Sequence, residues 1–345
     1  MENKTDPDRK YLLEKPNRRT FIKKSTIGFG IGAICSYLSF APENWYLSLK
    51  DPSGLRSLPK KEAFVLPDYR VKKPIDAAFV GIGHSIDVKK RLLKSLDAIG
   101  GLKHYIKPND LVFIKPNVAF DRSPELGATT NPIILGELIK LLFEEAKVKE
   151  VRVGDNPIES PADCFLKSGI KMVVEQNGGR IVLPDSNSFR ILSTPGADLI
   201  KEWSFFARPF KNVTKVIGLA PVKDHNLSQA SMGLKNWYGL LGGPRNQFHQ
   251  DIHTIISDLA IMINPTLSII DGSRILMRNG PTGGDPAYVE TSNIIISGTD
   301  PVAMDTWAFL NLLKRKEQQL PLYLTKAQQK GAGKMDFNGR LKEVV

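Results

Sequence analysis

The sequence predicts an α/β protein with a mostly parallel sheet and helices on both faces, preceded by a signal or anchor segment and a linker. From Asp76 onward, short and nearly continuous apolar runs alternate with segments of helical periodicity, a pattern typical of parallel strands buried on both faces. Three of the helical segments begin with proline, which loses nothing at the first helical turn because its N–H would be unpaired there. At 345 residues the chain can also bury a large core.

The elements follow one another in a regular order. Seven strands are expected, beginning at Ala77, Leu111, Glu150, Arg180, Val213, Leu267 and Asn293. Five helices are expected between them, over Ile86–Ile99, Pro132–Ala146, Pro161–Asn177, Asp251–Ile263 and Pro301–Leu313. We therefore expect residues 76–345 to form a single α/β domain.

The N-terminal segment, residues 1–41, has the features of an export signal. The charged stretch Asn17–Lys24 contains an Arg-Arg pair, and the uncharged run of residues 25–41 follows it. This order is typical of a twin-arginine signal. A plain membrane anchor is the alternative, although the run is short for a span. We expect a periplasmic or extracytoplasmic protein that is either cleaved from this segment or attached to the membrane through it.

Composition excludes several classes of function. Residues 42–75 are rich in proline and lysine and are expected to form an extended linker. The net charge is +12, but the basic residues are spread along the chain, so nucleic acid is not an expected partner. The only cysteines are Cys35 and Cys164. Without a Cys-x-x-Cys motif we expect no iron–sulfur cluster ligated by this chain, and Cys164 is expected to lie in the core.

Polar residues stand at the ends of five predicted strands: Lys115-Pro116-Asn117, Gly154-Asp155-Asn156, Lys223-Asp224-His225, Asp271-Gly272 and Thr299-Asp300. In open α/β sheets, ligands bind beyond the carboxyl ends of the strands. We therefore expect these residues to share one edge of the sheet and one site. The alternative is that Asp and Asn simply terminate strands and cap helices there.

Ordered fragments of the chain resemble the domain-of-unknown-function family number 362. The resemblance rests on FIKPNVAF, ATTNPIIL and VRVGDNP, then on the stretch from Leu219 to His249, and finally on LSIIDGSRILMRNGPTGGDP and IISGTDPVAMDTWA. It covers roughly residues 75–340 and implies an α/β fold and site positions, but no reaction. Some members carry ferredoxin-like cysteine motifs, which this chain lacks.

The candidate residues favour an anion pocket. The catalytic candidates are His225, Lys115 and Lys235, because histidine and lysine transfer protons and bind anions. The ligand-binding candidates are Asn117, Thr129, Thr130, Asp155, Lys223, Asn236, Asp271 and Asp305. Thr129 and Thr130 precede a helix start, where hydroxyl and N–H groups suit a carboxylate or phosphate but can equally cap the helix. Lys115 is expected to bind the ligand and to contribute little to the stability of the fold.

A divalent metal is the second chemistry that the sequence leaves open. His249 and His253 are four residues apart, so on one helix they would share a face and could bind a metal with His225 or Asp155. Alternatively, Asp251 caps a helix that begins after His249. Asp155, Asp271 and Asp305 are a further acidic combination. Asp305 falls in an apolar helix, where a carboxylate should face a lysine or the ligand.

Two functions remain open at this point. The first is an enzyme, or a binding protein, for a small anionic molecule, with or without a metal. The second is an accessory subunit of an exported redox complex whose iron–sulfur cluster sits on a partner chain. A dinucleotide fingerprint and a phosphate-binding P-loop are both missing from the sequence, so nucleotide cofactors held by those motifs are not expected.

Overall fold

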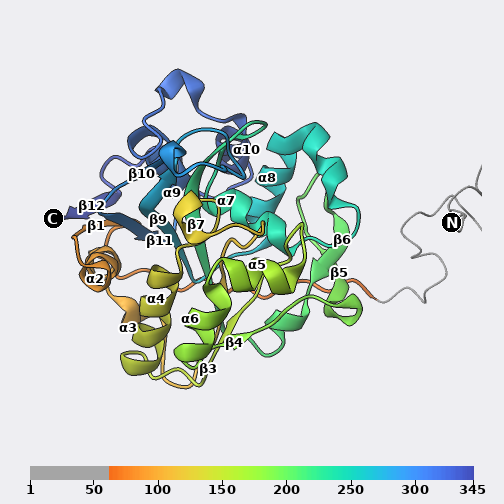
Figure 1. Cartoon of the computed structure of the whole chain (residues 1–345), viewed down its shortest axis with the longest axis horizontal. Helices are drawn as coiled ribbons and strands as arrows, with labels where there is room; N and C mark the ends of the chain where they lie inside the picture. Colours follow the sequence, from red (N-terminus) through yellow and green to blue (C-terminus); the bar gives the residue numbers. More distant parts are fainter. Residues whose placement is uncertain (1–61) are drawn as a thin grey trace, which may run out of the picture. The chain divides into compact units, whose positions relative to one another are not determined.

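The computed structural model describes residues 62–345. The segment 1–41, with its predicted signal or anchor, lies outside the described residues, as does most of the predicted linker. A ten-stranded sheet forms the centre of the described domain, and helices pack on both of its faces (Figure 1). The predicted α/β class with a mostly parallel sheet is confirmed. None of the helices in residues 62–345 is long and apolar enough to cross a membrane.

All seven predicted strands are present, together with five further ones in residues 62–345. The strands are β1 (Val80–His84), β2 (Leu111–Lys115), β3 (Glu150–Val153), β4 (Arg180–Ile181), β5 (Phe189–Ser193), β6 (Glu202–Phe206), β7 (Lys215–His225), β8 (Gln229–Ser231), β9 (Leu267–Leu276), β10 (Val289–Thr291), β11 (Ile294–Gly298) and β12 (Leu341–Val344). The main sheet has the order β12-β1-β11-β9-β7-β2-β3-β4, with β8 paired to β7 and β10 to β9, while β5 and β6 form a separate hairpin.

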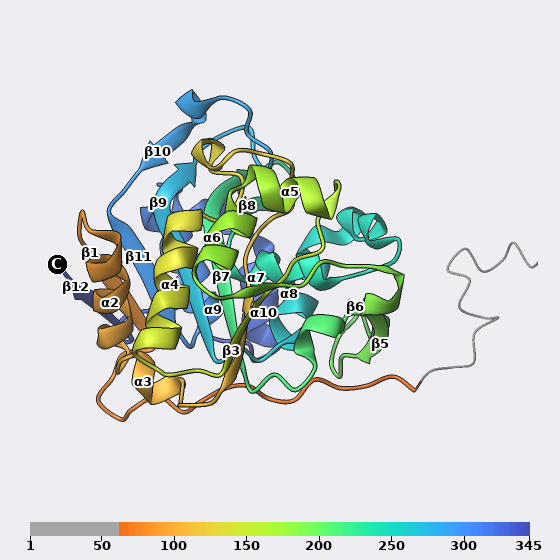
Figure 2. The same ribbon diagram turned by 60° about the horizontal axis from the view of Figure 1, so that its bottom comes forward.

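The helices lie in two layers. They are α2 (Val88–Ala98), α3 (Leu102–Tyr105), α4 (Pro132–Glu144), α5 (Pro161–Lys167), α6 (Ile170–Gln176), α7 (Gly233–Asn236), α8 (Ile252–Met262), α9 (Pro301–Asn311) and α10 (Leu322–Gln329). Figure 2 shows α2, α4 and α6 in front of the sheet and α8, α9 and α10 behind it. The single helix predicted over Pro161–Asn177 is wrong, because Gly169 takes a left-handed conformation (φ 72°) and divides it into α5 and α6.

Successive side chains of a strand point to opposite faces of the sheet, so one strand contributes to the apolar core on both faces. In β2, Val112 and Ile114 pack with the apolar side chains of α2 and α4, whereas Phe113 packs with those of α8 and α10. Both faces of the strand are therefore apolar, as expected for a strand covered on both sides. Cys164 is fully buried among the residues of the first layer, so the prediction that it belongs to the core is confirmed.

Two glycines of β1 allow helix α2 to lie directly on the sheet. A Cβ atom at Gly81 would stand 2.2 Å from the carbonyl oxygen of Ser95, and one at Gly83 would stand 2.2 Å from that of Arg91. Backbone atoms cannot move away as a flexible side chain could. The glycines in this stretch therefore serve the packing of a helix against a strand.

Strand direction decides which polar residues share an edge. β7 runs parallel to β2 and β9, and β2 runs parallel to β3, so the carboxyl ends of these strands lie at one edge. β11 runs antiparallel to both of its neighbours, and it therefore ends at the opposite edge. The expectation that Thr299 and Asp300 join the common edge is wrong. Asp300 instead caps α9 and forms an ion pair with Arg340 near the C-terminus.

Candidate functional site

Lys115 and Asp155 form a buried ion pair at the carboxyl edge of the sheet. Lys115 ends β2 and Asp155 follows β3, the neighbouring parallel strand. Their Nζ and Oδ1 atoms are 2.8 Å apart, and each side chain is 1% exposed. The Asp155 carboxylate also accepts hydrogen bonds from the backbone N–H of Val118 (2.7 Å) and Asn156 (2.9 Å). Its orientation is therefore fixed by three donors.

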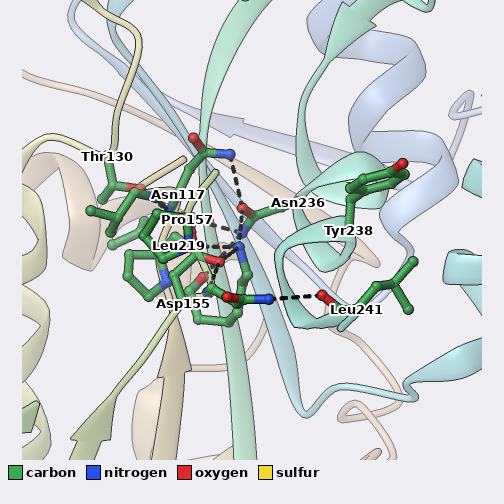
Figure 3. A network of polar contacts seen from close by, with 12 residues as sticks. Asn117, Thr130, Asp155, Pro157, Leu219, Asn236, Tyr238 and Leu241 are labelled. Carbon is green, nitrogen blue, oxygen red and sulfur yellow. Dashed lines mark hydrogen bonds and ion pairs between the residues drawn. The ribbon is translucent and has the colours of Figure 1, made fainter. Parts of the chain in front are cut away.

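Asn236 connects this pair to the rest of the network (Figure 3). Its Oδ1 accepts hydrogen bonds from Lys115 Nζ at 3.0 Å and from Asn117 Nδ2 at 3.2 Å, and its Nδ2 donates to the carbonyl of Lys115 at 3.0 Å. Lys115 also donates to the carbonyl of Pro116 at 2.8 Å. An ammonium group has three N–H donors, and those of Lys115 all have acceptors within the protein. This gives Lys115 a structural role that its sequence position did not indicate.

Thr130 belongs to the same network, whereas Thr129 does not. Thr130 Oγ1 donates to the carbonyl of Leu219 (2.9 Å) and accepts from the N–H of Asn117 (2.8 Å). The cap of α4 is Asn131, whose side chain accepts from the N–H of Ile133. Thr129 is buried, and its hydroxyl has no hydrogen-bond partner among the described residues. Neither threonine lines the cavity described below.

Lys223 is a second buried lysine, and its surroundings differ from those of Lys115. It lies in β7 and is 1% exposed. Its Nζ donates to two neutral acceptors, Asn117 Oδ1 at 3.1 Å and the carbonyl of Ala128 at 2.8 Å. No carboxylate of the described chain forms an ion pair with it. Burial, and then the positive charge of Lys235, lower the pKa of Lys223 to about 7.

His225, at the end of β7, is held in one tautomer. Its Nδ1 accepts hydrogen bonds from the backbone N–H of Leu227 (3.2 Å) and Ser228 (3.3 Å). The ring proton of the neutral imidazole must therefore be on Nε2, which makes that atom a donor. Burial and the neighbouring lysines lower the pKa of His225 to about 2. At neutral pH His225 is thus an uncharged hydrogen-bond donor.

Lys235 and Tyr238 come from the segment that follows β8. Lys235 lies in α7, and its Nζ is 5.3 Å from the centre of the Tyr238 ring, within the range of a cation–π interaction. Burial, together with the charges of Arg245 and Lys115, lowers the pKa of Lys235 to about 8. Burial thus lowers the pKa of all three lysines here, Lys115, Lys223 and Lys235.

These side chains enclose one small cavity of about 80 Å³. The polar residues that line it are Lys115, Asn117, Asp155, Asn156, Lys223, His225, Ser231, Lys235, Asn236, Tyr238, Arg245 and His249, with Ala119, Phe120, Ile158, Gly239 and Pro281 completing the wall. Most come from the carboxyl ends of β2, β3 and β7 and from the segment around α7. The cavity carries three lysines and one arginine but a single carboxylate.

Comparison with known proteins identifies the family. Residues 112–309 match the family described as Domain of unknown function (DUF362). The chain belongs to this family. The matched range includes every residue that lines the cavity, so the site lies within the DUF362 domain.

Known relatives and structures show more distant similarity. A thylakoid-associated protein from Synechocystis sp. is 27% identical over 227 residues, which are 61% of this chain and 65% of that protein. The match thus spans less than two thirds of the relative's length. The lactate racemase apoprotein from Thermoanaerobacterium thermosaccharolyticum shares 14% identity (TM-score 0.34, 61% of this chain and 54% of that one). A protein from Thermotoga maritima shares 11% (TM-score 0.32, 71% and 58%).

Asp271 of this DUF362 domain does not line the cavity. The pairing of β9 with β7 shifts after Asp271, because Pro221 pairs with Asp271 and the next residue, Val222, pairs with Ile275. This bulge places the buried carboxylate against the N–H of Ser273 (2.7 Å). Burial raises the pKa of Asp271 to about 6, and the Ser273 N–H partly opposes that rise. The expected convergence of Asp271 with Lys115 in one cavity is not observed.

Asp305 holds the backbone of the segment that forms one wall of the cavity. It is fully buried in α9, and its two oxygens accept hydrogen bonds from the N–H of Gly233 (2.9 Å) and Leu234 (3.1 Å). These residues begin α7, which carries Lys235 and Asn236. The expectation that Asp305 faces a lysine or a ligand is wrong, because its partners are backbone groups. Asp305 is a positioning residue for the cavity wall.

His249 and His253 belong to different elements. His249 lies in a 3₁₀ helix (Arg245–Asp251) and lines the cavity, while His253 follows the cap Asp251 in α8. The ring of His253 stacks on Tyr323 with a centroid distance of 6.2 Å. The structure thus has the arrangement in which Asp251 caps a helix that begins after His249. Within residues 62–345, no group of three His, Cys, Asp or Glu side chains is placed to hold a metal ion.

Arg245 is a cavity residue that the sequence did not single out. Its guanidinium donates to the carbonyls of Leu241 (3.0 Å), Asn156 (2.7 Å) and Pro157 (3.0 Å). It therefore ties the loop after β3 to the segment after α7. Its position after Gly-Gly-Pro carries no pattern typical of such a role, so only the three-dimensional contacts reveal it.

The buried state of Asp305 predicts a pH dependence of stability. Burial raises its pKa to about 7, so between the pKa of an unfolded aspartate, about 3.9, and about 7 the folded state binds the extra proton. The free energy of unfolding should therefore decrease as the pH rises through this window. In Asp305→Asn, which cannot ionise, urea unfolding at about pH 5 and about pH 8 should show a clearly smaller decrease. Equal decreases in both proteins would contradict the prediction.

Proposed function

We propose that this DUF362 domain binds a small anionic molecule in the cavity at the carboxyl edge of its sheet. The observation that carries the proposal is the charge of the lining: Lys115, Lys223, Lys235 and Arg245 face one carboxylate, Asp155. That carboxylate is already paired with Lys115. The cavity therefore has an excess of positive charge in a place with little water, where an anion is strongly favoured.

Hydrogen-bond donors support the same proposal. His225 presents an N–H at Nε2, because its other ring nitrogen is occupied as an acceptor. Lys235 contributes an ammonium group when it is protonated, and it packs on Tyr238. A carboxylate or phosphate group needs several donors converging from different directions. The small volume favours a ligand of few atoms over a polymer or nucleotide.

Anion binding should be coupled to proton uptake. The pKa values of Lys223 and Lys235 are lowered to about 7 and about 8 by burial and by neighbouring positive charges. A bound anion would raise the pKa of Lys235, so the complex takes up a proton near pH 8. We expect affinity for acetate, glyoxylate or phosphate to fall as the pH rises above about 8. Calorimetry in buffers of different ionisation enthalpy measures the protons taken up.

A surface variant provides the control for this measurement. Lys171→Met removes a positive charge from an exposed position on α6 and should leave affinity and proton uptake unchanged. Lys235→Met should weaken binding by about tenfold or more, which corresponds to about 1.4 kcal/mol. If none of these anions binds, or if binding ignores pH, the proposal is wrong. A cysteine-rich protein that co-purifies in equal amount would instead favour the accessory-subunit function.

Export is the second part of the proposal. It rests on the Arg18-Arg19 pair and the uncharged run after it, and the name of the thylakoid-associated relative is compatible with a membrane-linked location. Replacing both arginines with lysine keeps the charge but removes the guanidinium groups. The double variant should accumulate in the cytoplasm, as fractionation and immunoblotting would measure. Normal export of the double variant would refute the twin-arginine route.

A further inference from the structure

Two buried lysines of the cavity differ in the groups that accept their hydrogen bonds. Lys115 has the carboxylate of Asp155 at 2.8 Å and neutral acceptors at its other two N–H groups. Lys223, equally buried, has only neutral acceptors. A buried ammonium without a counter-ion is costly, so such a group gives up its proton. The structure thus separates a lysine that is paired with a carboxylate from one that has only neutral acceptors.

The hydrogen bonds of Lys223 leave one position on its nitrogen unoccupied. A neutral amine has two N–H donors and one lone pair. The two donors of Lys223 have their acceptors in Asn117 Oδ1 and the carbonyl of Ala128. The lone pair is then the remaining position, on a residue that lines the cavity. A desolvated lysine next to other cationic groups is the arrangement that makes an amine nucleophilic.

We propose that Lys223 is a nucleophilic amine that condenses with the carbonyl group of a small oxoacid bound in the cavity. The inference rests on the proposed function, because the carboxylate of the oxoacid is the anion of that proposal. It narrows the ligand class to small carboxylates that also carry an aldehyde or ketone.

The chemical step is a balanced condensation. The lone pair of Lys223 Nζ attacks the carbonyl carbon, the π electrons move to the oxygen, and the oxygen gains a proton while the nitrogen loses one. The resulting carbinolamine loses its hydroxyl group and its remaining N–H proton as water, which leaves an imine between Nζ and the former carbonyl carbon. One water is released and nothing is oxidised or reduced. Lys235, whose charge changes near neutral pH, is the cavity residue suited to donate the proton to the departing oxygen.

Neighbouring groups fit this assignment. Phe120 has its ring centre 5.6 Å from Lys223 Nζ and adds apolar surface that keeps water from the amine. Asn117 orients Lys223 through its Oδ1 while its Nδ2 is bound to Asn236. The amide is thereby fixed in one orientation, and the amine with it. Lys115 cannot play the nucleophile, because its nitrogen has no free position.

Reductive trapping tests the inference on the full-length protein. Glyoxylate or pyruvate is added with cyanoborohydride near neutral pH, and the modified lysines are mapped by mass spectrometry. We expect a carboxymethyl or carboxyethyl group on Lys223, formed at least about tenfold faster than on any exposed lysine, because the neutral fraction of an ordinary lysine is far smaller. Acetate, which has the charge but no carbonyl, should slow the labelling by competition.

The outcomes separate this inference from the proposed function. If acetate and pyruvate both bind by calorimetry but Lys223 is not labelled, the imine is refuted and the anion site stands. If neither binds, the proposed function fails. Labelling confined to Lys235 or to surface lysines also refutes the assignment to Lys223. Lys223→Met should abolish the specific label and Lys171→Met should retain it, and the site mapped in the unmodified protein does not depend on the folding of either variant.

Discussion

Replacing Asp155 with asparagine is expected to lower the free energy of unfolding by about 3–5 kcal/mol, the cost of leaving a buried charge without its partner. Asp155 and Lys115 are each 1% exposed and 2.8 Å apart. Asparagine has nearly the same shape but no charge, and only one of its two terminal atoms can accept a hydrogen bond. It therefore also weakens the contacts with the N–H groups of Val118 and Asn156. Equilibrium unfolding in urea measures the loss.

The double variant Lys115→Met with Asp155→Asn is the control for this prediction. It removes the positive charge as well, and a buried ion pair replaced by uncharged groups often costs little. We expect the double variant to recover part of the stability that Asp155→Asn loses. If Asp155→Asn unfolds at the same urea concentration as the unmodified protein, the pair contributes no net stability. If the double variant is less stable than Asp155→Asn and Lys115→Met alone, the hydrogen bonds of Lys115 contribute more to stability than its unpaired charge costs.

Much of the fold could be predicted because parallel strands have a distinct sequence pattern. The segments LVFIK and EVRV form β2 and β3 and are mostly buried, and the residues at or just after their ends carry the ion pair. Because parallel strands end at one edge of a sheet, the sequence alone predicts that Lys115 and Asp155 lie together. The same rule places Lys223 and His225 of β7 beside them, and both line the cavity.

The direction of β11 is indicated by the sequence, although the positions of the strand ends alone do not show it. A parallel return from β9 would need a crossover of a dozen or more residues, usually helical. The connection from Leu276 to Ile294 contains a short 3₁₀ helix and the strand β10 but no α-helix. An antiparallel return is therefore favoured. Because β11 runs in this direction, Asp300 lies at the opposite edge of the sheet. The helix that carries Asp305, α9, begins there.

Other features depend on contacts that no local pattern reports. The bulge between β7 and β9 removes Asp271 from the cavity; Gly272 beside it is a residue that often marks a bulge, but it does not show which side chain leaves the site. The different roles of Lys115 and Lys223 are also invisible in sequence, since both come near strand ends with similar neighbours. They are distinguished by Asp155, which forms an ion pair with Lys115 and not with Lys223.

Gly239→Ala is expected to break the same ion pair without changing a charge. A Cβ atom at Gly239 would stand 2.0 Å from Asp155 Oδ1 and 2.8 Å from Lys115 Nζ. The carboxylate cannot move aside, because the N–H groups of Val118 and Asn156 hold it. We expect a loss of about 3–5 kcal/mol in the free energy of unfolding. Anion affinity should fall by at least about tenfold, since Gly239 lines the cavity.

Gly243→Ala is the matched control, four residues further along the same segment. Gly243 has a φ of 61°, and no atom lies closer than 3.8 Å to the position of an added Cβ. Alanine there has only the backbone strain of a left-handed conformation, about 1–2 kcal/mol. The ion pair and anion binding should therefore survive in Gly243→Ala and be lost in Gly239→Ala, as unfolding and calorimetry measured on both would show. Equal losses in the two variants would mean that the segment responds to any added side chain, and that the close approach of Gly239 to the Lys115–Asp155 pair has no special importance for the cavity.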